Sequence, residues 1–526
     1  MAAGSAFAAR LTTATGAGPL RPGSLRSRPG DRARRWRYLP YDQLHAALGP
    51  LATLSPHELG VVLIESPAKA RRRPYHRQKL ALVLANQRHF ALELAARGVE
   101  VRYLVDADGY APAIAAAARV LGPLAMMEAA ERELRVELAP LVADGALQVE
   151  PHAGWLTTAD EFVAWAGPRP PWRMDAFYRG ARRASGLLME GARPAGGKFS
   201  HDADNRRPWR GTPSPPPPPR FVPDELTREV GALVERAFAS HPGQLDLEAL
   251  PATVADAEAL WAWALRACLP HFGPYEDAMS SRSRTLFHTL VSSVVNLHRV
   301  LPARVVADVA GAELPLSSQE GFIRQVLGWR EFVRHVHVAT DGFRTVSLRE
   351  GAPLPPAFWG APSGLACLDG VVADVWRTGY GHHITRLMVL SNLANLFDAS
   401  PRELSDWFWI AYADAYDWVV EPNVLGMGTF AAGDLMTTKP YVAGAAYVHK
   451  MSDYCGTCAF DPRRTCPLTR LYWAFLDRHA RALAGNQRMA VPLAALRKRA
   501  PAERARDAET FAAVRATLDA GATLRP

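Results

Sequence analysis

The sequence lacks any hydrophobic run of about 18 residues, the length that a membrane-spanning helix needs, so a transmembrane helix is excluded. The first 30 residues also lack the continuous apolar core of a secretion signal, because Arg10, Arg21, Arg26 and Arg28 interrupt them. With only 5 cysteines in 526 residues, the chain does not resemble a disulfide-rich secreted protein. We therefore expect a cytoplasmic protein that has no membrane partner.

Neither charge nor length identifies a function. The chain carries 61 Lys and Arg against 52 Asp and Glu, a formal net charge of +9 with a pI near 9.4. This balance favours polyanions such as nucleic acid, but a general abundance of arginine explains it equally well. The length suggests roughly two to four domains.

The first part of the chain alternates predicted strands and helices. Short apolar runs with β-branched residues predict strands, and stretches with helical spacing lie between them: strands at Leu59–Glu65, Glu100–Val105 and Leu147–Glu150, and helices at Gln78–Arg97 and Pro112–Val120. This order is typical of a Rossmann-like parallel sheet. We expect a disordered basic tail at residues 1–36 and an α/β domain at 37–150.

The rest of the chain is predicted to be helical. Residues 151–235 lack periodicity and contain the proline-rich Gly211–Arg220, which predicts an interdomain linker in a polyproline conformation. Residues 236–500 repeat apolar positions at three- and four-residue spacing, typical of an all-α domain, with predicted helices that include Arg284–Val300, His382–Phe397 and Glu403–Tyr416. A final helix or tail occupies residues 501–526.

Four of the five cysteines follow a metal-binding pattern. Cys455 and Cys458 form a Cys-x2-Cys turn, Cys466 is followed by proline, and Cys367 lies far upstream. The spacing suits a [4Fe–4S] cluster and a tetrahedral zinc ion equally, so both remain open at this point. Cys268 is expected to be a small core residue.

Several motifs give a more specific indication. They are Tyr41–Leu44 (YDQL), where a first strand is expected, Phe272–Met279 (FGPYEDAM), Gly328–Phe332 (GWREF), His382–Leu390 (HHITRLMVL), Asp414–Asn423 (DAYDWVVEPN), Lys439–Tyr441 (KPY) and Met451–Cys458 (MSDYCGTC). Together they resemble the iron–sulfur bacterial branch of the photolyase/cryptochrome family, the prokaryotic (6-4) photolyases. The resemblance covers about residues 37–500. It implies an α/β antenna-type domain followed by an all-α domain that binds FAD and a [4Fe–4S] cluster.

The resemblance also implies roles for individual residues. The catalytic group is His382, His383 and Tyr441, and the electron relay is Trp359, Trp407 and Tyr416. The residues implied to bind FAD are Tyr275, Ser292, Ser293, Trp329, Arg330, Arg386, Asp414 and Asn423. The cluster ligands are Cys367, Cys455, Cys458 and Cys466.

Helical spacing gives an independent expectation for one of the histidines. His383 shares a predicted face with Leu387, Leu390 and Ala394, so we expect it to point into the core or a core-lined pocket. Position alone is also compatible with a structural histidine. A side chain that titrates near neutrality suits proton donation to a photolesion, the role that the resemblance implies.

Two sites depart from the family pattern. Near the antenna, where the family has a second acid four residues after Glu65, this chain has Lys69 followed by three arginines, so a lumazine-type antenna chromophore is without support. Beside the flavin, where the family usually has an acid, this chain has Val420, with Glu421 next to it.

We therefore expect a monomeric lyase that repairs UV-damaged DNA. Reduced FAD, excited by light, would inject an electron into a flipped-out (6-4) pyrimidine photoproduct. The first alternative is a blue-light sensory cryptochrome that does not repair DNA. The second is a DNA-binding module that carries zinc and no flavin.

Overall fold

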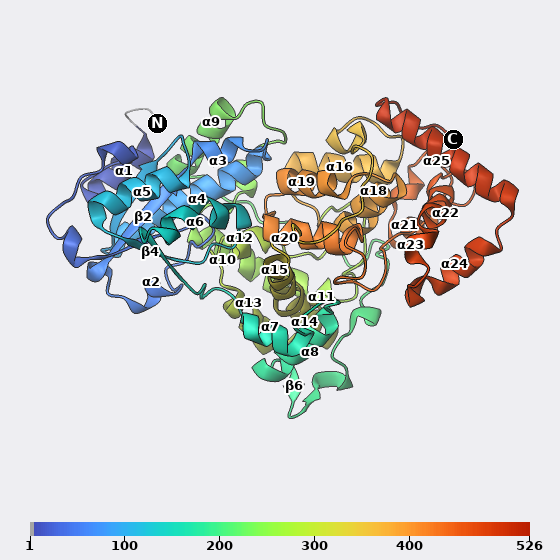
Figure 1. Cartoon of the computed structure of the whole chain (residues 1–526), viewed down its shortest axis with the longest axis horizontal. Coiled ribbons are helices and arrows are strands. Elements are labelled where there is room, and N and C mark those ends of the chain that lie inside the picture. Colours follow the sequence, from blue (N-terminus) through green and yellow to red (C-terminus); the bar gives the residue numbers. More distant parts are fainter. Residues whose placement is uncertain (1–4) are drawn as a thin grey trace.

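A computed structural model of the chain describes residues 5–526. The α/β domain lies at one end of the molecule and the C-terminal helices at the other (Figure 1). Five parallel strands form the sheet in the order β3-β2-β1-β4-β5: β1 (Arg35–Tyr38), β2 (Leu59–Glu65), β3 (Glu100–Val105), β4 (Leu124–Met127) and β5 (Leu147–Glu150). The predicted α/β fold class with a parallel sheet is confirmed.

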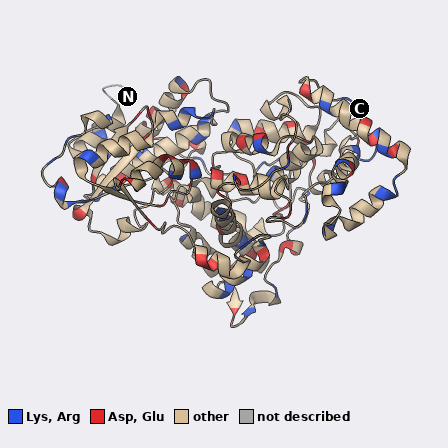
Figure 2. Ribbon diagram, viewed as in Figure 1, with Lys and Arg blue, Asp and Glu red and all other residues tan. Residues whose placement is uncertain are grey.

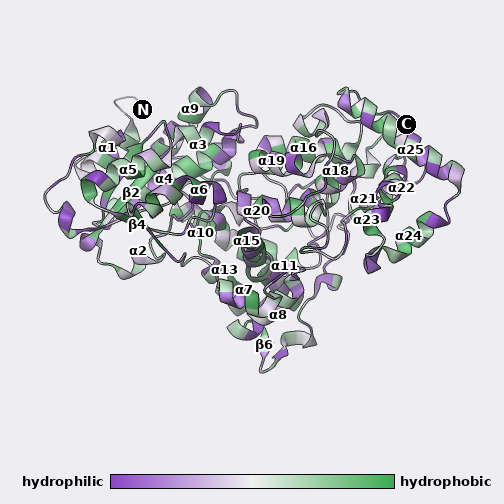
Figure 3. Cartoon of the chain, viewed as in Figure 1, coloured by the Kyte–Doolittle hydropathy of each residue, from purple (hydrophilic) through white to green (hydrophobic). Residues whose placement is uncertain are grey.

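Helices cover both faces of this sheet. On one face α4 (Arg77–Ala96) packs against α1 (Ala6–Thr15) and α9 (Glu225–Ala237), and on the other α5 (Tyr110–Leu121) packs against α6 (Arg132–Ala143). Every residue of β2 is buried, which explains its continuous apolar run (Figure 3). The strand order reverses between β1 and β4, the place where such sheets form a crevice. Since β1 ends at Tyr38, Tyr41–Leu44 follows the first strand and does not begin it.

The expectation of a disordered N-terminal tail is wrong for the described residues 5–36. Phe7 and Leu11 of α1 are completely buried, and the Phe7 ring lies 4.8 Å from the ring of Tyr103. Leu20 extends the sheet by forming a parallel bridge to Leu104. Apolar anchors at helical spacing therefore outweigh the high arginine content of this segment.

The segment 151–235 is also more ordered than expected. It contains two helices, α7 (Ala159–Ala166) and α8 (Met174–Ser185), and a small hairpin formed by β6 (Met189–Glu190) and β7 (Arg193–Pro194). A capping box, in which Thr158 and Glu161 satisfy each other's backbone amides, begins α7. The longest stretch without helix or strand is residues 205–224, which includes the proline-rich Gly211–Arg220.

The remainder of the described chain is helical. Its helices are α10 (Val254–Trp263), α11 (Leu269–Phe272), α12 (Ser292–Asn296), α13 (Pro302–Gly311), α14 (Leu316–Ile323), α15 (Glu331–Ala339), α16 (Ala366–Thr378), α17 (His383–Thr385), α18 (Asn392–Leu396), α19 (Pro401–Ala411), α20 (Asp417–Glu421), α21 (Ala445–Met451), α22 (Leu468–Arg478), α23 (Ala480–Leu483), α24 (Ala490–Arg497) and α25 (Pro501–Asp519). None of them combines the length and the apolar character that crossing a bilayer requires. The predicted all-α C-terminal domain is confirmed.

The expectation of a helix across Arg284–Val300 is wrong. Only α12 is helical there, because Leu286, Leu290 and His298 have positive φ angles of 45°, 59° and 58°. Non-glycine residues adopt this backbone only where the surroundings fix it. The resulting irregular loop brings His288 and Ser292 beside the helix that begins at His383.

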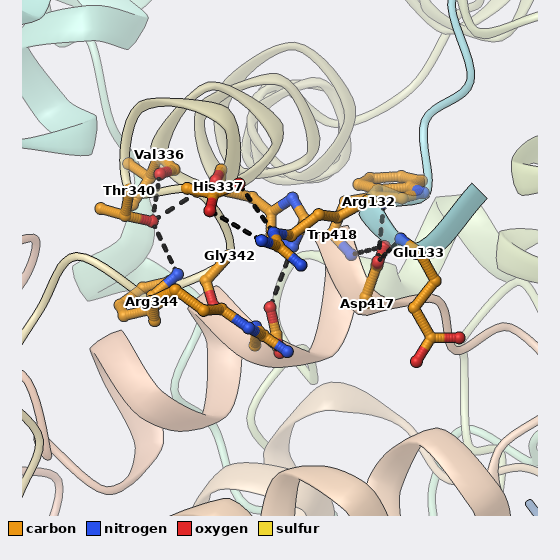
Figure 4. A network of polar contacts seen from close by, with 12 residues as sticks. Arg132, Glu133, Val336, His337, Thr340, Gly342, Arg344, Asp417 and Trp418 are labelled. Carbon is orange, nitrogen blue, oxygen red and sulfur yellow. Dashed lines mark hydrogen bonds and ion pairs between the residues drawn. The ribbon is translucent and has the colours of Figure 1, made fainter. Parts of the chain in front are cut away.

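A polar network joins the sheet domain to the helical domain (Figure 4). The Asp417 carboxylate accepts hydrogen bonds from the backbone amides of Arg132 and Glu133 at the start of α6, at 2.7 and 3.3 Å. The Arg132 guanidinium in turn makes two 2.7 Å bonds to Asp341. An acid at a helix N-terminus opposes the partial positive charge there, so this contact stabilises the docking of the sheet domain.

Candidate functional site

The centre of the site is a buried ion pair between the helical segment Arg386–Ser391 and the turn that joins α19 to α20. Nη2 of Arg386 lies 3.0 and 2.9 Å from the two carboxylate oxygens of Asp414. The Ser292 hydroxyl donates to the same carboxylate at 2.6 Å, and the Asn296 amide donates to the Asp414 carbonyl at 2.9 Å. Burial lowers the pKa of Arg386, but the Asp414 charge outweighs it and the pKa is raised. The guanidinium therefore remains charged.

Three histidines gather beside this pair. A nitrogen from each of His288, His382 and His383 lies within 4.8 Å of the others. The rings of His288 and His382 stack at 4.2 Å with planes only 6° apart. Burial, followed by the neighbouring imidazoles, holds the pKa of both well below the usual range, so these two rings are neutral at pH 7. Nε2 of His288 and Nδ1 of His382 are buried and have no hydrogen-bond partner among the described residues.

The structure buries His382 in place of His383, which was expected to point into the core. His382, and not His383, is the buried ring, whereas the side chain of His383 is 40% exposed. His383 is the first residue of its helix, and a π-helical segment from Arg386 to Ser391 then changes the spacing of the faces. The apolar stripe predicted from regular helical spacing therefore does not continue to His383.

His383 faces an acidic side chain. Its Nε2 lies 3.6 Å from the Asp277 carboxylate. Asp277 also interacts electrostatically with Tyr441 and Tyr447, and Arg206 lies beside both tyrosines. Tyr441 and His383 thus lie around one acid, although 58 positions separate them in the sequence. Burial raises the pKa of Tyr441, so its hydroxyl keeps its proton at pH 7.

The other residues assigned to FAD binding are more dispersed. Arg330 is buried against the Trp155 ring, 4.3 Å from its centre, with Nη2 unpartnered, and its Nε is 3.5 Å from Asn296. Burial lowers the pKa of Arg330 to about 10. Tyr275 packs on Phe287, Trp329 packs on Phe332, and the Asn423 amide donates to the Val419 carbonyl one turn earlier. Ser293 lies next to Ser292 on α12, partly buried.

A row of aromatic rings leads from the surface to the ion pair. Trp359, with 49% of its surface exposed, stacks on Trp376 at 5.6 Å. Trp376 contacts Trp407 edge-on at 5.6 Å, and Trp407 lies 5.9 Å from Tyr412, whose ring lies 3.9 Å from the Arg386 guanidinium. The structure places Tyr416 elsewhere, stacked on Tyr41 of the sheet domain at 6.5 Å.

Sequence reasoning overlooked Trp376 and His288. Trp376 follows Leu368 and Val372 at four-residue spacing on α16, so the apolar stripe of that helix was a usable signal. No comparable signal marks His288, because it lies in the irregular loop before α12.

Glu421, the acid next to Val420, does not bond to the residues of the site. Its carboxylate bonds to His337 at 3.0 Å and to Arg344.

The four cysteines assigned to a metal centre come together. Burial raises the pKa of the Cys367 thiol, and the nearby thiols of Cys466, Cys455 and Cys458 raise it further. Cys367, at the start of α16, lies in the main hydrophobic core, and Cys455, Cys458 and Cys466 pack against that core. Cys268 is separate and fully buried, as expected of a core residue.

Comparisons with known proteins agree with this architecture. Residues 37–249 match the family described as deoxyribodipyrimidine photo-lyase-related protein. A (6-4) photolyase of Agrobacterium fabrum is 36% identical over 473 residues, which cover 86% of this chain and 93% of that protein. An uncharacterized protein of Acanthamoeba polyphaga mimivirus is 44% identical over 66 residues, or 12% of this chain and 54% of that protein.

A solved structure shares the fold. The crystal structure of a bacterial class III photolyase from Agrobacterium tumefaciens superposes with a TM-score of 0.56 at 15% identity, covering 94% of this chain and all of that one. The resemblance found in the sequence motifs is thereby confirmed. The chain belongs to the photolyase-related family.

Proposed function

We propose that this chain is a light-driven DNA-repair lyase of the (6-4) photolyase type, which acts on UV-damaged DNA as a monomer. The observation that carries the proposal is the convergence of the buried Arg386–Asp414 pair with three histidines, two of which, His288 and His382, have a buried nitrogen without a partner in the described chain. The 36% identity to a (6-4) photolyase over most of both chains supports it.

The residues around the ion pair fit FAD. Buried polar atoms are normally satisfied, yet Nδ1 of His382, Nε2 of His288 and Oη of Tyr412 have no partner in the described chain. A polar heterocycle beside Arg386 would satisfy such atoms. We assign Arg386, Asp414 and Ser292 to hold the flavin and Arg330 to a phosphate. When bound, FAD supplies the light-excited electron donor.

We assign His383 to hold the proton that the lesion requires. His288 and His382 are kept neutral by burial, whereas His383 is partly exposed and its Nε2 lies 3.6 Å from the Asp277 carboxylate. A flipped-out base that approaches from solvent would meet His383 first, because it is the exposed ring of the three, and Asp277 also interacts electrostatically with Tyr441. His382 orients His383 as its neighbour.

We infer that the four cysteines hold a [4Fe–4S] cluster and not zinc. A tetrahedral zinc ion, with bonds of about 2.3 Å to each sulfur, holds its thiolates only about 3.8 Å apart. Within residues 5–526, the histidine trio is the one group with three ligand atoms mutually within 4.8 Å, so no three cysteine sulfurs lie that close. A set of four thiols that is gathered but spread out fits a larger inorganic core.

We further propose that the aromatic row Trp359–Trp376–Trp407 carries electrons between solvent and the site. Its rings lie 5.6 Å apart at each step, and only Trp359 is exposed. Tyr416 is not included, because it stacks on the sheet domain instead.

The residues at the expected antenna position do not fit a lumazine. Both carboxylate oxygens of Glu65 bond to Arg88, at 3.1 and 3.0 Å, and Tyr103 donates to one of them. The Lys69 ammonium lies 3.0 Å from both Glu131 and Glu133. The polar groups of this region thus bond to one another, and we propose no antenna chromophore.

A photorepair assay on oligonucleotides with either a (6-4) or a cyclobutane lesion tests the proposal. We expect light-dependent repair of the (6-4) lesion by the wild-type holoprotein. His383→Ala should abolish it with FAD still bound, whereas His57→Ala, an exposed histidine of the sheet domain, should not. No light-dependent turnover on either lesion, together with normal photoreduction, would favour the sensory cryptochrome.

A further inference from the structure

A cavity lies near the C-terminus, away from the histidine site. Its volume is about 690 Å³, and its walls are the loop that carries Cys466, one side of α22, the facing side of α25 and the last residues of the chain. α22 and α25 lie side by side at this end of the molecule (Figure 1). The volume falls within the roughly 300–1,000 Å³ typical of small-ligand sites.

The lining of this cavity has one sign of charge. Five of the lining residues are arginines and none is aspartate or glutamate. Acidic and basic residues are interspersed along α25 (Figure 2), but none of its acidic residues, Glu503, Asp507, Glu509 and Asp519, lines the cavity. The cavity therefore attracts anions.

Two of these arginines are neutralised and three are not. Arg470 and Arg499 each pair with Asp507, at 3.1 and 2.5 Å. For Arg463, Arg464 and Arg525, no carboxylate of the described chain lies within ion-pair distance. These three exposed guanidiniums give the rim a positive charge without an internal partner.

A helix N-terminus and the C-terminal tail also favour phosphate binding in this cavity. Its wall contains the first turn of α22, with Thr469 and Arg470, where backbone amides have no helical acceptor. A helix N-terminus favours an anion. The C-terminal tail is held in place because the Leu524 amide donates to the Ser363 carbonyl at 2.9 Å, which keeps Arg525 at the rim.

An aromatic ring adds a second kind of contact. Trp473 of α22 lines the cavity, and the Arg499 guanidinium lies 4.9 Å from its ring centre. A partly exposed indole offers a stacking surface for a planar heterocycle. The cavity borders the proposed metal centre, since Cys466 lines it, but the other three cysteines assigned to that centre do not.

We propose that this cavity binds a nucleoside phosphate, with its phosphates on Arg463, Arg464 and Arg525 and its base against Trp473. Cationic groups alone would suit any polyanion, but the limited volume of about 690 Å³ and the one indole in the wall fit a mononucleotide better than a continuing strand. The site is independent of the repair function proposed above.

Fluorescence anisotropy of N-methylanthraniloyl-ADP, titrated with the FAD-loaded full chain, tests the proposal. Flavin release is monitored so that binding at the FAD site is recognised. We expect saturable binding that unlabelled ADP displaces, with adenosine and inorganic phosphate at least about tenfold weaker, because each makes only half of the contacts.

Variants locate the binding. The double variant R463Q/R464Q should weaken binding at least about tenfold, since it removes two charge-assisted contacts. Trp473→Leu should reduce the preference for ADP over phosphate. The matched control R497Q/K498Q removes two exposed charges at the end of α24, outside the cavity, and should leave binding unchanged.

Four results would overturn the proposal. The first is the absence of saturation, and the second is equal binding by R463Q/R464Q and the control. The third is displacement by inorganic phosphate as effective as displacement by ADP, which indicates an adventitious ion only. The fourth is displacement by a 12-nucleotide oligothymidylate at a lower concentration of phosphate groups than ADP requires, which indicates a strand-binding surface.

Discussion

The Arg386 guanidinium and the Asp414 carboxylate face each other at 2.9 and 3.0 Å, in the interior of the helical domain. Arg386 lies in a helical segment and Asp414, 28 positions later, lies in the turn between α19 and α20. Ser292 from a third segment bonds to the same carboxylate at 2.6 Å. The pair therefore fixes the geometry of three elements at once and keeps a positive charge at the proposed flavin site.

Replacing Asp414 by asparagine should empty this site of flavin. The substitution leaves a buried guanidinium without its counter-charge, which typically costs about 3–5 kcal/mol. We expect a loss of most bound FAD and a clear fall in the free energy of unfolding, measured by flavin absorbance and urea denaturation. Asp175→Asn, which breaks an exposed pair with Arg179, should cost less than about 1 kcal/mol. Equal effects of the two variants would contradict a special role for Asp414.

The sheet domain was predictable because its signals are local. The bounds of β2, β3 and β5 follow directly from apolar runs, whereas the burial of α1 depends on contacts with α4 and α9 that no local pattern contains. The same contrast holds in the site. Family motifs identified Arg386 and Asp414, but the exposed position of His383 depends on a π-helical segment that regular helical spacing cannot predict.

The cysteine assignment makes a quantitative prediction. Wild-type protein isolated without oxygen should contain about four iron atoms and about four sulfides per chain. Cys466→Ser should lose at least half of both, because one of four ligands is removed, whereas Cys268→Ser, at the buried fifth cysteine, should retain them. Metal analysis and an acid-labile sulfide assay measure this. One zinc per chain without sulfide would contradict the cluster.

Trp376 is the central ring of the proposed relay. Trp376→Phe keeps an aromatic side chain between Trp359 and Trp407 but removes the readily oxidised indole. We expect photoreduction of bound FAD to slow at least about tenfold, since electron transfer must then span the gap between the outer rings. Trp165→Phe, a ring that packs on Phe177 outside the row, should leave the rate unchanged. Unaltered photoreduction in Trp376→Phe would show that electrons reach the flavin by another route.

Asp42 should make the protein less stable as the pH rises. Burial raises the pKa of its carboxyl from 3.8 to about 7, and Asp417 raises it further while Arg330 and Lys69 oppose the shift. The folded state thus binds a proton that the unfolded state releases between about pH 4 and pH 7, so the free energy of unfolding falls across that window. Asp42→Asn removes this ionisation.

The variant and the wild type should therefore have similar stability near pH 4 and diverge above it. At pH 8 we expect Asp42→Asn to be the more stable by at most about 4 kcal/mol, the value of a shift of about three pKa units. Urea denaturation at several pH values measures the difference, and subtracting the two curves removes the titration of all other groups. Glu190→Gln, at an exposed acid in the β6–β7 hairpin, should run parallel to the wild type. A constant difference across the pH range would mean that Asp42 is ionised in the folded protein throughout.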